Sequence, residues 1–542
     1  MFRLSLSTGC LGVLLVALSC KPTTPDNQFP TDAIAADMKV LASDDFQGRR
    51  PFTDGETKTV AYLQQQFKAI GFEPGNGDSY VQAVPMAEIT TMTDSVMPIT
   101  GGKQPLRLSG RRDFILWTDR PEPEVKLEQD ELVFVGFGVV APEYGWNDYA
   151  GLDMKNKIAV VLVNDPGFGG DDTTFFKGNT MTYYGRWTYK HEEATRQGAK
   201  GCLVIHNTVP AGYGFNVPQV AWNNPHLLLD DRGQESYKCA GLGWLSYEAT
   251  QQLFDAAGLD FRQLQTDARK PGFKAVPMKL KASATMHNTV RYNQSYNVIA
   301  KITGTTHPDE VVIYSAHWDH LGIGKKDEKG DSIYNGAGDN ASGTAGLLAL
   351  ARATTAQPKP DRTVVFLSFT AEEQGLWGSA YYVSHPVYPL AKTVANINMD
   401  MMNPWGKTKD IVVIGIGQND LEDNLRAAAA KVNRYVAREP SPQAGLYFRS
   451  DHFHFAKVGV PALFATGGID HAEKGIEYGR QQQSDFTAKR YHRPSDEFDP
   501  ALWHLDGVAD NLQLLFNVGD GLSRSAAWPQ WKPTSEFKDI KR

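Results

Sequence analysis

The stretch VVIYSAHWDH occupies residues 311–320 and sets the fold class. Residues 311–316 are apolar or small and include β-branched side chains, which predicts a short buried strand. The same texture returns at residues 298–302, 363–369, 394–399 and 411–414. Helix-like segments lie among these runs at residues 341–353, 375–384 and 420–432. Strands that alternate with helices predict an α/β fold with a mostly parallel central sheet and helices on both faces.

Side chains with metal-binding or catalytic chemistry follow these predicted strands. His317 and Asp319 come directly after residues 311–316, and Asp400 follows the strand at residues 394–399. The other members are Asp339 in a glycine-rich loop, Glu372 and Glu373 after residues 363–369, and His492 in a late loop. In sheets of this kind the ligand site lies at the carboxyl ends of the strands. We therefore expect these side chains to share one pocket.

Two histidines and three carboxylates can hold a pair of zinc ions. Zinc binds imidazole nitrogen and carboxylate oxygen, and a catalytic zinc keeps one position open for water. Asp339 is the natural bridging ligand, because its glycine-rich loop lets the backbone approach closely. One ion would then take His317 and Asp400, and the other would take Glu373 and His492. The cofactor that we expect is two Zn²⁺ ions, about 3.5–4 Å apart.

This array resembles the family of co-catalytic zinc peptidases that contains bacterial leucyl aminopeptidases and glutamate carboxypeptidase. The resemblance covers about residues 290–520, with the ligands in the family's order. Its motifs are His317-Trp318-Asp319, the loop of residues 336–343 around Asp339, Glu372-Glu373, Asn398-Met399-Asp400-Met401, and Tyr491-His492 followed by Pro494 and Asp496. Gly338 departs from the pattern, since many relatives carry a second acid there. All ligand positions are nevertheless filled.

The resemblance also suggests roles for the residues around the ligands. Glu372 would act as general base on a metal-bridging hydroxide and then as acid to the leaving amine. Asp319 would accept the second imidazole N–H of His317 and so fix its tautomer. Tyr491 would donate a hydrogen bond to the developing oxyanion. A segment similar to the family's pocket wall supplies the candidate substrate-binding residues Tyr447, Phe448, Ser450, Asp451 and His452.

Several further histidines match no ligand position. They are His320, His452, His454 and His471. We expect them to support the site, to line the pocket or to lie at the surface.

The expected function is that of a zinc-dependent exopeptidase acting on peptides, and an aminopeptidase is the preferred assignment. One alternative is a glutaminyl-cyclase-like transferase, but those relatives hold one zinc, whereas this sequence has the full ligand set. The other is a non-catalytic, receptor-like binding protein. Such relatives lose ligands, and this sequence has lost none.

Two further regions flank or interrupt the catalytic pattern. Apolar side chains at helical spacing predict helices that begin near residue 31 and cover about residues 55–70. Residues 131–285 resemble a protease-associated domain, a β-rich module inserted in peptidases, on the strength of Gly136-Phe137-Gly138, residues 149–153 and residues 194–205. We expect residues 31–130 and 286–542 to form the catalytic domain around this insert.

The N-terminus is typical of a targeting segment. Residues 1–19 carry Arg3 and an apolar run, which predicts a signal peptide, and Cys20 resembles a lipoprotein cleavage site. Residues 20–30 would form a tether. We expect a cell-envelope protein, either periplasmic or membrane-anchored through Cys20. Ordinary secretory cleavage is the alternative.

Composition agrees with a globular protein of more than one domain. The chain has 542 residues, 41% hydrophobic and 22% charged. A net charge of -7 and the lack of a long basic run argue against a nucleic-acid partner. Outside the leader only Cys202 and Cys239 remain, and they either pair in an oxidising compartment or stay as thiols.

Overall fold

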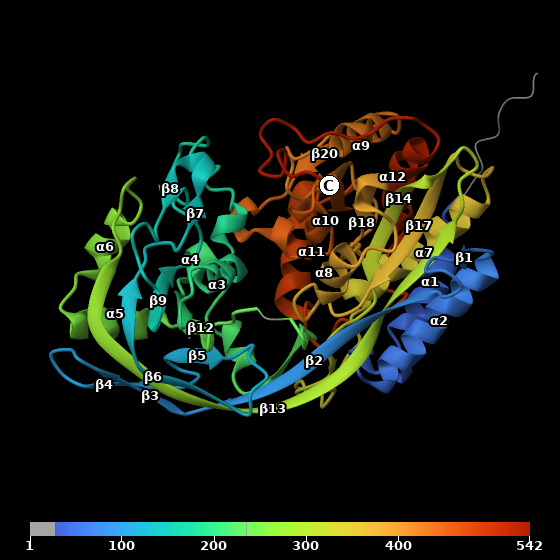
Figure 1. The fold of residues 1–542 in the computed structure, drawn as a ribbon. Helices are drawn as coiled ribbons and strands as arrows, with labels where there is room; N and C mark the ends of the chain where they lie inside the picture. The colour runs from blue at the N-terminus through green and yellow to red at the C-terminus, as the bar shows by residue number, and fades with distance from the viewer. Residues whose placement is uncertain (1–27, 235) are drawn as a thin grey trace, which may run out of the picture.

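The computed structural model describes residues 28–234 and 236–542, which form two lobes joined by two long strands (Figure 1). The strands are β2 (Val81–Thr93) and β13 (Val276–Ile302), which pair antiparallel and run beneath both lobes. We call residues 28–93 and 287–542 the main lobe, and residues 94–286 the second lobe. The expected signal peptide, Cys20 and the tether as far as residue 27 lie outside the described residues.

The main lobe is built on the predicted sheet. Its strands lie in the order β13, β17 (Arg362–Phe369), β14 (His307–His317), β18 (Thr393–Asn398), β21 (Ala462–Gly467), β19 (Asp410–Val413) and β20 (Tyr435–Arg438). The four central strands, β17, β14, β18 and β21, are parallel to one another. Strands β13 and β19 pair with the outer two in the antiparallel direction. The short β1 (Glu73–Pro74) pairs with β13. The predicted mostly parallel sheet is confirmed.

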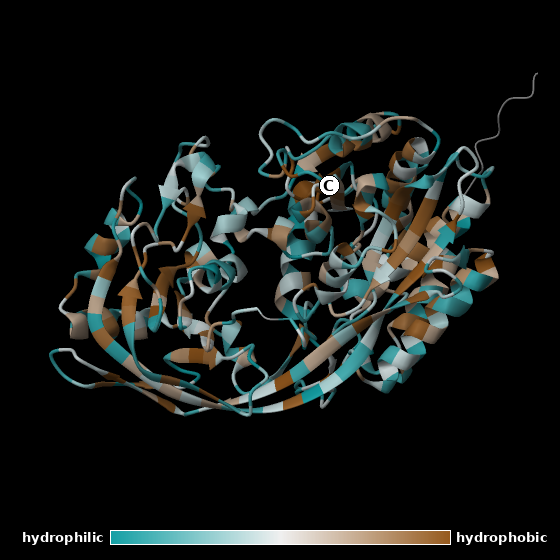
Figure 2. Ribbon diagram, in the orientation of Figure 1, coloured by the Kyte–Doolittle hydropathy of each residue, from teal (hydrophilic) through white to brown (hydrophobic). Residues whose placement is uncertain are grey.

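Helices cover both faces of this sheet, as predicted. One face packs against α1 (Thr31–Leu41), α2 (Asp54–Ile70), α7 (Ser342–Thr355), α9 (Leu421–Ala430) and α12 (Leu505–Ser523). The opposite face packs against α8 (Trp377–Ser384) and α10 (His452–Lys457). Strand β17 is buried on both faces, because successive side chains of a strand point in opposite directions. Val364 and Phe366 pack against the first group of helices, and Val365 and Leu367 pack against α8 and α10. Figure 2 shows the hydrophobic residues gathered on these strands.

The N-terminal helices form where their apolar spacing predicts. Val60, Leu63 and Phe67 of α2 are buried at helical spacing. The helix stops at Gly71, whose φ of 99° requires the left-handed conformation that glycine adopts without strain. Between α1 and α2, the short turn η1 (Asp44–Arg49) brings Arg49 into the core.

The second lobe has its own core, and most of its strands continue the sheet of the main lobe through β2 and β13. Its strands are β3 (Val96–Thr100), β4 (Leu106–Ser109), β5 (Phe114–Trp117), β6 (Glu124–Phe134), β7 (Val140–Ala141), β8 (Trp146–Asn147), β9 (Lys157–Leu162), β10 (Gly201–Ile205), β11 (Pro225–Leu229) and β12 (Gly241–Leu245). Its helices are α3 (Trp187–Arg196), α4 (Thr208–Ala211), α5 (Tyr247–Ala257) and α6 (Phe261–Asp267). Strands β6, β9, β10 and β12 are parallel neighbours.

The core of the second lobe extends beyond the segment 131–285 that the sequence suggested. Met97, Leu108 and Leu116 pack in the same cluster as Leu132 and Ile158. Strands β3 to β5 therefore belong to this lobe, since they complete its sheet. The resemblance of the insert to a protease-associated domain stays a prediction.

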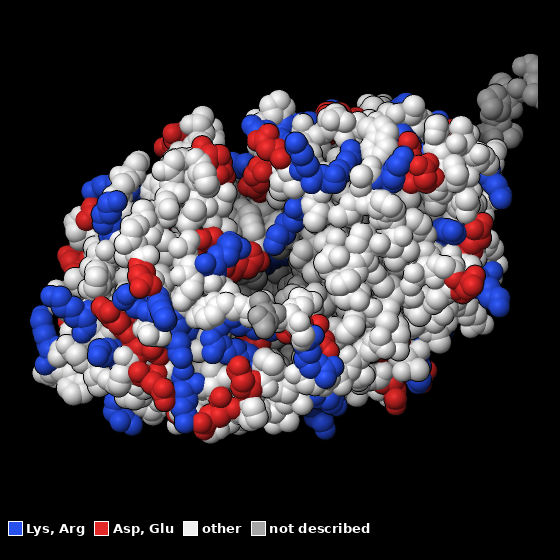
Figure 3. Space-filling view, viewed as in Figure 1, with Lys and Arg blue, Asp and Glu red and all other residues white. Residues whose placement is uncertain are grey.

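The remaining elements are short or lie at the rim. They are β15 (Gly322–Ile323), β16 (Ile333–Tyr334), α11 (Gly475–Lys489) and the single turns η5 (Ala337–Ala341), η7 (Pro442–Ala444) and η8 (Leu446–Phe448). A space-filling view shows a hollow between the lobes (Figure 3). Among the described residues, no helix combines the length and apolar character needed to cross a bilayer. Cys202 and Cys239 are buried free thiols.

Candidate metal centre

The carboxyl ends of the parallel strands bring the predicted ligands together. His317 is the last residue of β14, and Asp400 lies just beyond the end of β18. Glu372 and Glu373 follow β17, which pairs with β14 up to His317. Because these strands run in parallel, their ends meet at one edge of the sheet. Loops then add Asp339 from η5 and His492 from the segment after α11.

Asp339 lies between the two predicted histidine ligands. One of its carboxylate oxygens, Oδ1, is 3.3 Å from His317 Nε2, and the other, Oδ2, is 3.1 Å from His492 Nε2. The Oδ1 atom of Asp400 is 3.4 Å from the same His317 nitrogen. This is the arrangement expected of a carboxylate that bridges two cation positions.

Glu373 completes the second half of the cluster. Its Oε2 atom is 3.1 Å from His492 Nε2, and its Oε1 atom is 2.5 Å from His320 Nδ1. His320 thus contacts a predicted ligand directly. Two histidines compete for the position beside Glu373.

The donor set fits metal ions. One group of potential ligands is His317, Asp339 and Asp400, and another is His320, Asp339 and Glu373, each with its ligand atoms within 4.8 Å of one another. Both groups contain Asp339, and imidazole with carboxylate is a donor set that zinc accepts. Buried carboxylates in such numbers also require positive charge nearby, since burying unpaired charge is costly.

The side chains of the cluster shift the pKa values of one another. Burial opposes the charge on Asp339, yet hydrogen bonds from His317 and His492 hold its pKa well below the usual range. Burial and the charge of Asp339 would raise the pKa of Glu373, but His492 and His320 lower it to about 2. The pKa of Glu372 rises well above its usual value, because Glu372 is buried and lies near Asp400 and Glu373.

Asp319 supports the site from behind. His317 Nδ1 lies 3.2 Å from the backbone carbonyl oxygen of Asp319 and 3.7 Å from its carboxylate Oδ1. The carboxylate instead accepts the backbone N–H groups of Glu372, at 3.0 Å, and Glu373, at 3.4 Å. Asp319 therefore orients both the histidine and the Glu372–Glu373 pair, with its carbonyl as the closer partner of the imidazole.

Tyr491 lies over the second ligand position. Its ring stacks on the ring of His492 with centroids 3.9 Å apart. Burial, followed by the charges of Asp339 and Glu373, raises the pKa of its hydroxyl well above the usual value. The hydroxyl is therefore protonated at neutral pH and available as a donor.

The candidate substrate-binding residues are all buried. Tyr447 and Phe448 pack in an apolar cluster with Phe453 and Phe464. The pKa of Asp451 is raised to about 7, chiefly by burial, and neither carboxylate oxygen has a hydrogen-bond partner within the described residues. The full list of buried candidates is Tyr447, Phe448, Ser450, Asp451 and His452. Direct contact between these residues and a substrate stays a prediction.

Two residues that the sequence did not single out hold the ligand loops. Asp496 accepts the backbone N–H groups of Gly338, at 3.0 Å, and Asp339, at 3.2 Å. Arg49 is 1% exposed and donates to the carbonyl oxygens of Trp318 (2.8 Å), Gly336 (2.9 Å), Leu41 (2.6 Å) and Asn335 (2.6 Å). Asp496 stood inside a recognised motif, whereas no local pattern marks Arg49.

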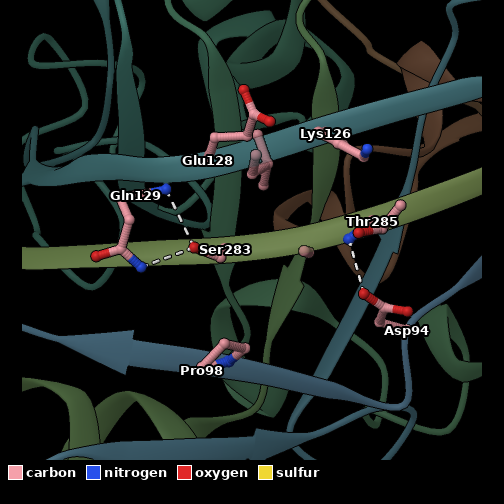
Figure 4. Close-up of a pocket in the computed structure, with 9 residues that line it drawn as sticks. Asp94, Pro98, Lys126, Glu128, Gln129, Ser283 and Thr285 are labelled. Atoms are coloured by element: carbon pink, nitrogen blue, oxygen red, sulfur yellow. Dashed lines mark hydrogen bonds between the residues drawn. The ribbon is translucent and has the colours of Figure 1, made fainter.

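A groove in the second lobe has no comparable chemistry. It encloses about 440 Å³ beside β6 and β13 and is lined in part by Lys126, Glu128, Gln129 and Ser283 (Figure 4). Its polar groups satisfy one another, since Gln129 donates to Ser283 and the Thr285 N–H donates to Asp94. The metal-ligating cluster in the main lobe is therefore the better candidate for a functional site.

Comparison with known proteins matches the main lobe to a family of peptidases. Residues 297–515 match the model of Peptidase family M28, which confirms the resemblance seen in the motifs. The chain is 32% identical over 273 residues to aminopeptidase YwaD of Bacillus subtilis, covering 50% of each protein. It is 36% identical over 284 residues to a probable zinc metalloprotease of Leptosphaeria maculans, covering 52% of this chain and 62% of that protein.

These curated relatives are matched over part of their length, about half for the Bacillus protein. A solved structure is matched more completely. The aminopeptidase from Aneurinibacillus sp. strain AM-1 superimposes with a TM-score of 0.51 over 93% of this chain and 96% of that chain, at 21% identity. This likeness shows that both lobes share one overall fold with that protein.

Proposed function

We propose that this protein is a zinc-dependent aminopeptidase that removes N-terminal residues from peptides. The observation that carries the proposal is the pair of ligand groups that share Asp339. The family match over residues 297–515 and the aminopeptidase relatives support it. The glutaminyl-cyclase-like and receptor-like alternatives are not favoured, because every ligand expected of a two-metal peptidase is present.

Two zinc ions would be held by side chains that already face one another. His317 and Asp400 would hold one ion, Glu373 and His492 the other, and Asp339 would bridge them. When bound, zinc polarises a carbonyl and makes water more acidic. The protein's own contribution is to fix these ligands through Asp319, Asp496 and Arg49.

Glu372 is the proton carrier in this proposal. It is buried, and its backbone N–H donates to the carboxylate of Asp319. Its raised pKa suits a group that takes a proton from water and then gives it to the leaving amine. Tyr491 would donate its hydroxyl hydrogen to the oxygen of the substrate carbonyl as negative charge develops there.

The setting of the enzyme is also part of the proposal. We place it in the cell envelope, periplasmic or anchored through Cys20, on the basis of the N-terminal sequence. The second lobe would act as a protease-associated domain that bounds the hollow in front of the metal centre.

The proposal is tested by comparing leucine p-nitroanilide with its N-acetylated form. Wild-type protein should cleave only the free-amine substrate. Glu372→Gln should bind as much zinc as wild type but cleave roughly 10²–10⁴-fold more slowly. Glu328→Gln, an exposed change on the β15–β16 hairpin, is the matched control. Equal cleavage of the acetylated substrate would contradict the aminopeptidase assignment.

A further inference from the structure

Two arginine side chains from different lobes lie beside the candidate metal centre, and neither has an acidic partner among residues 28–234 and 236–542. Arg186 precedes α3 in the second lobe and is 9% exposed. Arg449 follows η8 in the main lobe and directly precedes Ser450 and Asp451. Within the described part of the chain, neither Nε atom has a hydrogen-bond partner, although both atoms are buried.

Each arginine packs against the opposite lobe. The guanidinium carbon of Arg449 lies 5.5 Å from the centroid of the Tyr213 ring, which belongs to the second lobe. A Cβ atom added to Gly445 of the main lobe would lie 3.4 Å from Cδ of Arg186. The two side chains therefore meet where the lobes face each other.

The same place borders the metal centre. Tyr491 stacks on His492, and the positive charge of Arg449 opposes the carboxylates that raise the pKa of Tyr491. Burial and, next, the positive charge of Arg449 lower the pKa of Arg186 to about 10, while Tyr491 opposes this shift. Figure 3 shows basic side chains on the wall of the hollow between the lobes.

Two neighbouring positive charges, one buried (Arg186) and one half-buried (Arg449), are unfavourable by themselves when no counter-charge lies beside them. Both desolvation and mutual repulsion oppose them. A guanidinium group offers parallel N–H donors that match a carboxylate in a bidentate arrangement. An incoming carboxylate would relieve the repulsion and use the free donors at the same time.

We propose that Arg186 and Arg449 together bind a carboxylate group of the peptide substrate. This inference rests on the proposed function and narrows it to peptides that carry a negative charge close to the bond that is cut. The carboxylate comes either from the C-terminus of a dipeptide or from an acidic side chain. Because the lobes supply one arginine each, substrate binding would also draw on the second lobe directly.

Matched substrates test the proposal and separate the two sources. Leu-Gly is compared with Leu-Gly amide, and Leu-Glu amide with Leu-Gln amide. Wild-type protein should show a kcat/KM for the charged member of at least one pair that is on the order of 10-fold to 100-fold higher, as expected for hydrogen bonds to charged groups. A preference in the first pair identifies the C-terminal carboxylate, and one in the second pair identifies an acidic side chain.

Variants assign the preference to the arginines. Arg186→Gln and Arg449→Gln should each bring the ratio of kcat/KM values toward one, and Arg449→Lys should restore part of it, because lysine keeps the charge but loses the fork. Arg438→Gln, an exposed change at the end of β20, should keep the wild-type ratio. The zinc content of each variant shows whether the metal centre is intact.

The outcomes distinguish this inference from the proposed function. Equal kcat/KM values within both pairs, with leucine p-nitroanilide still cleaved, would overturn the arginine subsite and leave the aminopeptidase assignment standing. A charge preference that survives in folded Arg186→Gln and Arg449→Gln would overturn it as well. Failure to cleave any free-amine substrate would count against the proposed function itself.

Discussion

At the scale of single residues, two histidines compete for the ligand position beside Glu373. His492 Nε2 lies 3.1 Å from carboxylate oxygens of both Asp339 and Glu373, whereas His320 Nδ1 contacts Glu373 at 2.5 Å. Only His492 faces both carboxylates closely through one nitrogen. We assign the ligand role to His492 and a supporting role to His320.

Replacement of each histidine tests this assignment. His492→Ala should lower the zinc content from about two ions to about one per chain, because the ligand between Asp339 and Glu373 is lost. His320→Ala should keep close to the full content. Metal analysis of both purified variants decides the matter, and the opposite pattern would exchange the two roles.

The role of Arg49 could not be predicted from any local pattern of residues. Its four carbonyl partners come from three separate segments, so its role depends entirely on long-range packing. The metal ligands, in contrast, were predictable because zinc chemistry restricts the residue types and parallel strands restrict their places. Asp496 could be located through its motif, but its hydrogen bonds to the Asp339 loop could not.

Arg49→Met should therefore destabilise the main lobe and weaken zinc binding. It removes hydrogen bonds from a charged donor and leaves buried carbonyl groups without partners, with an expected cost of about 3 kcal/mol or more. Thermal unfolding and competition with a zinc chelator measure the two effects. Arg50→Met, which removes a partly exposed ion pair with Glu88, is the control and should cost about 1 kcal/mol or less.

At the scale of elements, the sequence predicted what local periodicity encodes. Strands β14, β17 and β18 and helices α2 and α7 form close to the expected residues, because each is marked by buried β-branched runs or by apolar helical spacing. The 27-residue strand β13 was not foreseen as one element. Its middle forms an exposed ribbon with β2, so its burial pattern changes along its length although the strand does not end.

Helix α7 offers a test of the packing that carries the metal centre. Leu348 is fully buried in the middle of α7, the helix that directly follows the turn presenting Asp339. Leu348→Ala should lower the free energy of unfolding of the main lobe by about 2–5 kcal/mol, through lost burial and the cavity that remains. Thr355→Ala, exposed at the end of the same helix, is the control. Calorimetry with equal stabilities for both variants would contradict the role given to α7.

At the scale of the whole molecule, the two lobes have separate cores and meet across the hollow. Strands β3 to β5, which precede the predicted insert of residues 131–285, join the second core. No composition change marks the boundary between the lobes, because the chain enters and leaves the second lobe along the continuous strands β2 and β13. The site arginines Arg186 and Arg449 depend on this arrangement, which single motifs do not encode.

The buried His191 should contribute a loss of stability to the second lobe in mild acid. His191 is buried beside Trp117 and Trp187, and burial lowers its pKa to about 4 although Asp119 opposes the shift. Because the folded pKa lies below the unfolded value of about 6.5, the unfolded chain binds the proton first, and stability falls as the pH drops from about 7 toward 4. Between pH 7 and pH 5 the expected loss is about 2 kcal/mol.

His191→Gln should remove this part of the acid sensitivity. Urea unfolding followed by tryptophan fluorescence at pH 7 and pH 5 measures it. The exposed His307, changed to Gln, is the matched control and should keep the wild-type dependence. An unchanged pH dependence in His191→Gln would show that other groups are responsible.

The most direct test of the central claim is the zinc content of the purified protein and of Asp339→Asn. The bridging role of Asp339 predicts about two zinc ions per chain in the wild type and a loss of both metal and cleavage of leucine p-nitroanilide in the variant. Asp309→Asn, an exposed change, should retain both. The account would be contradicted by a wild-type protein that binds no zinc even when zinc is in excess. An Asp339→Asn variant with full zinc content and full activity would contradict it as well.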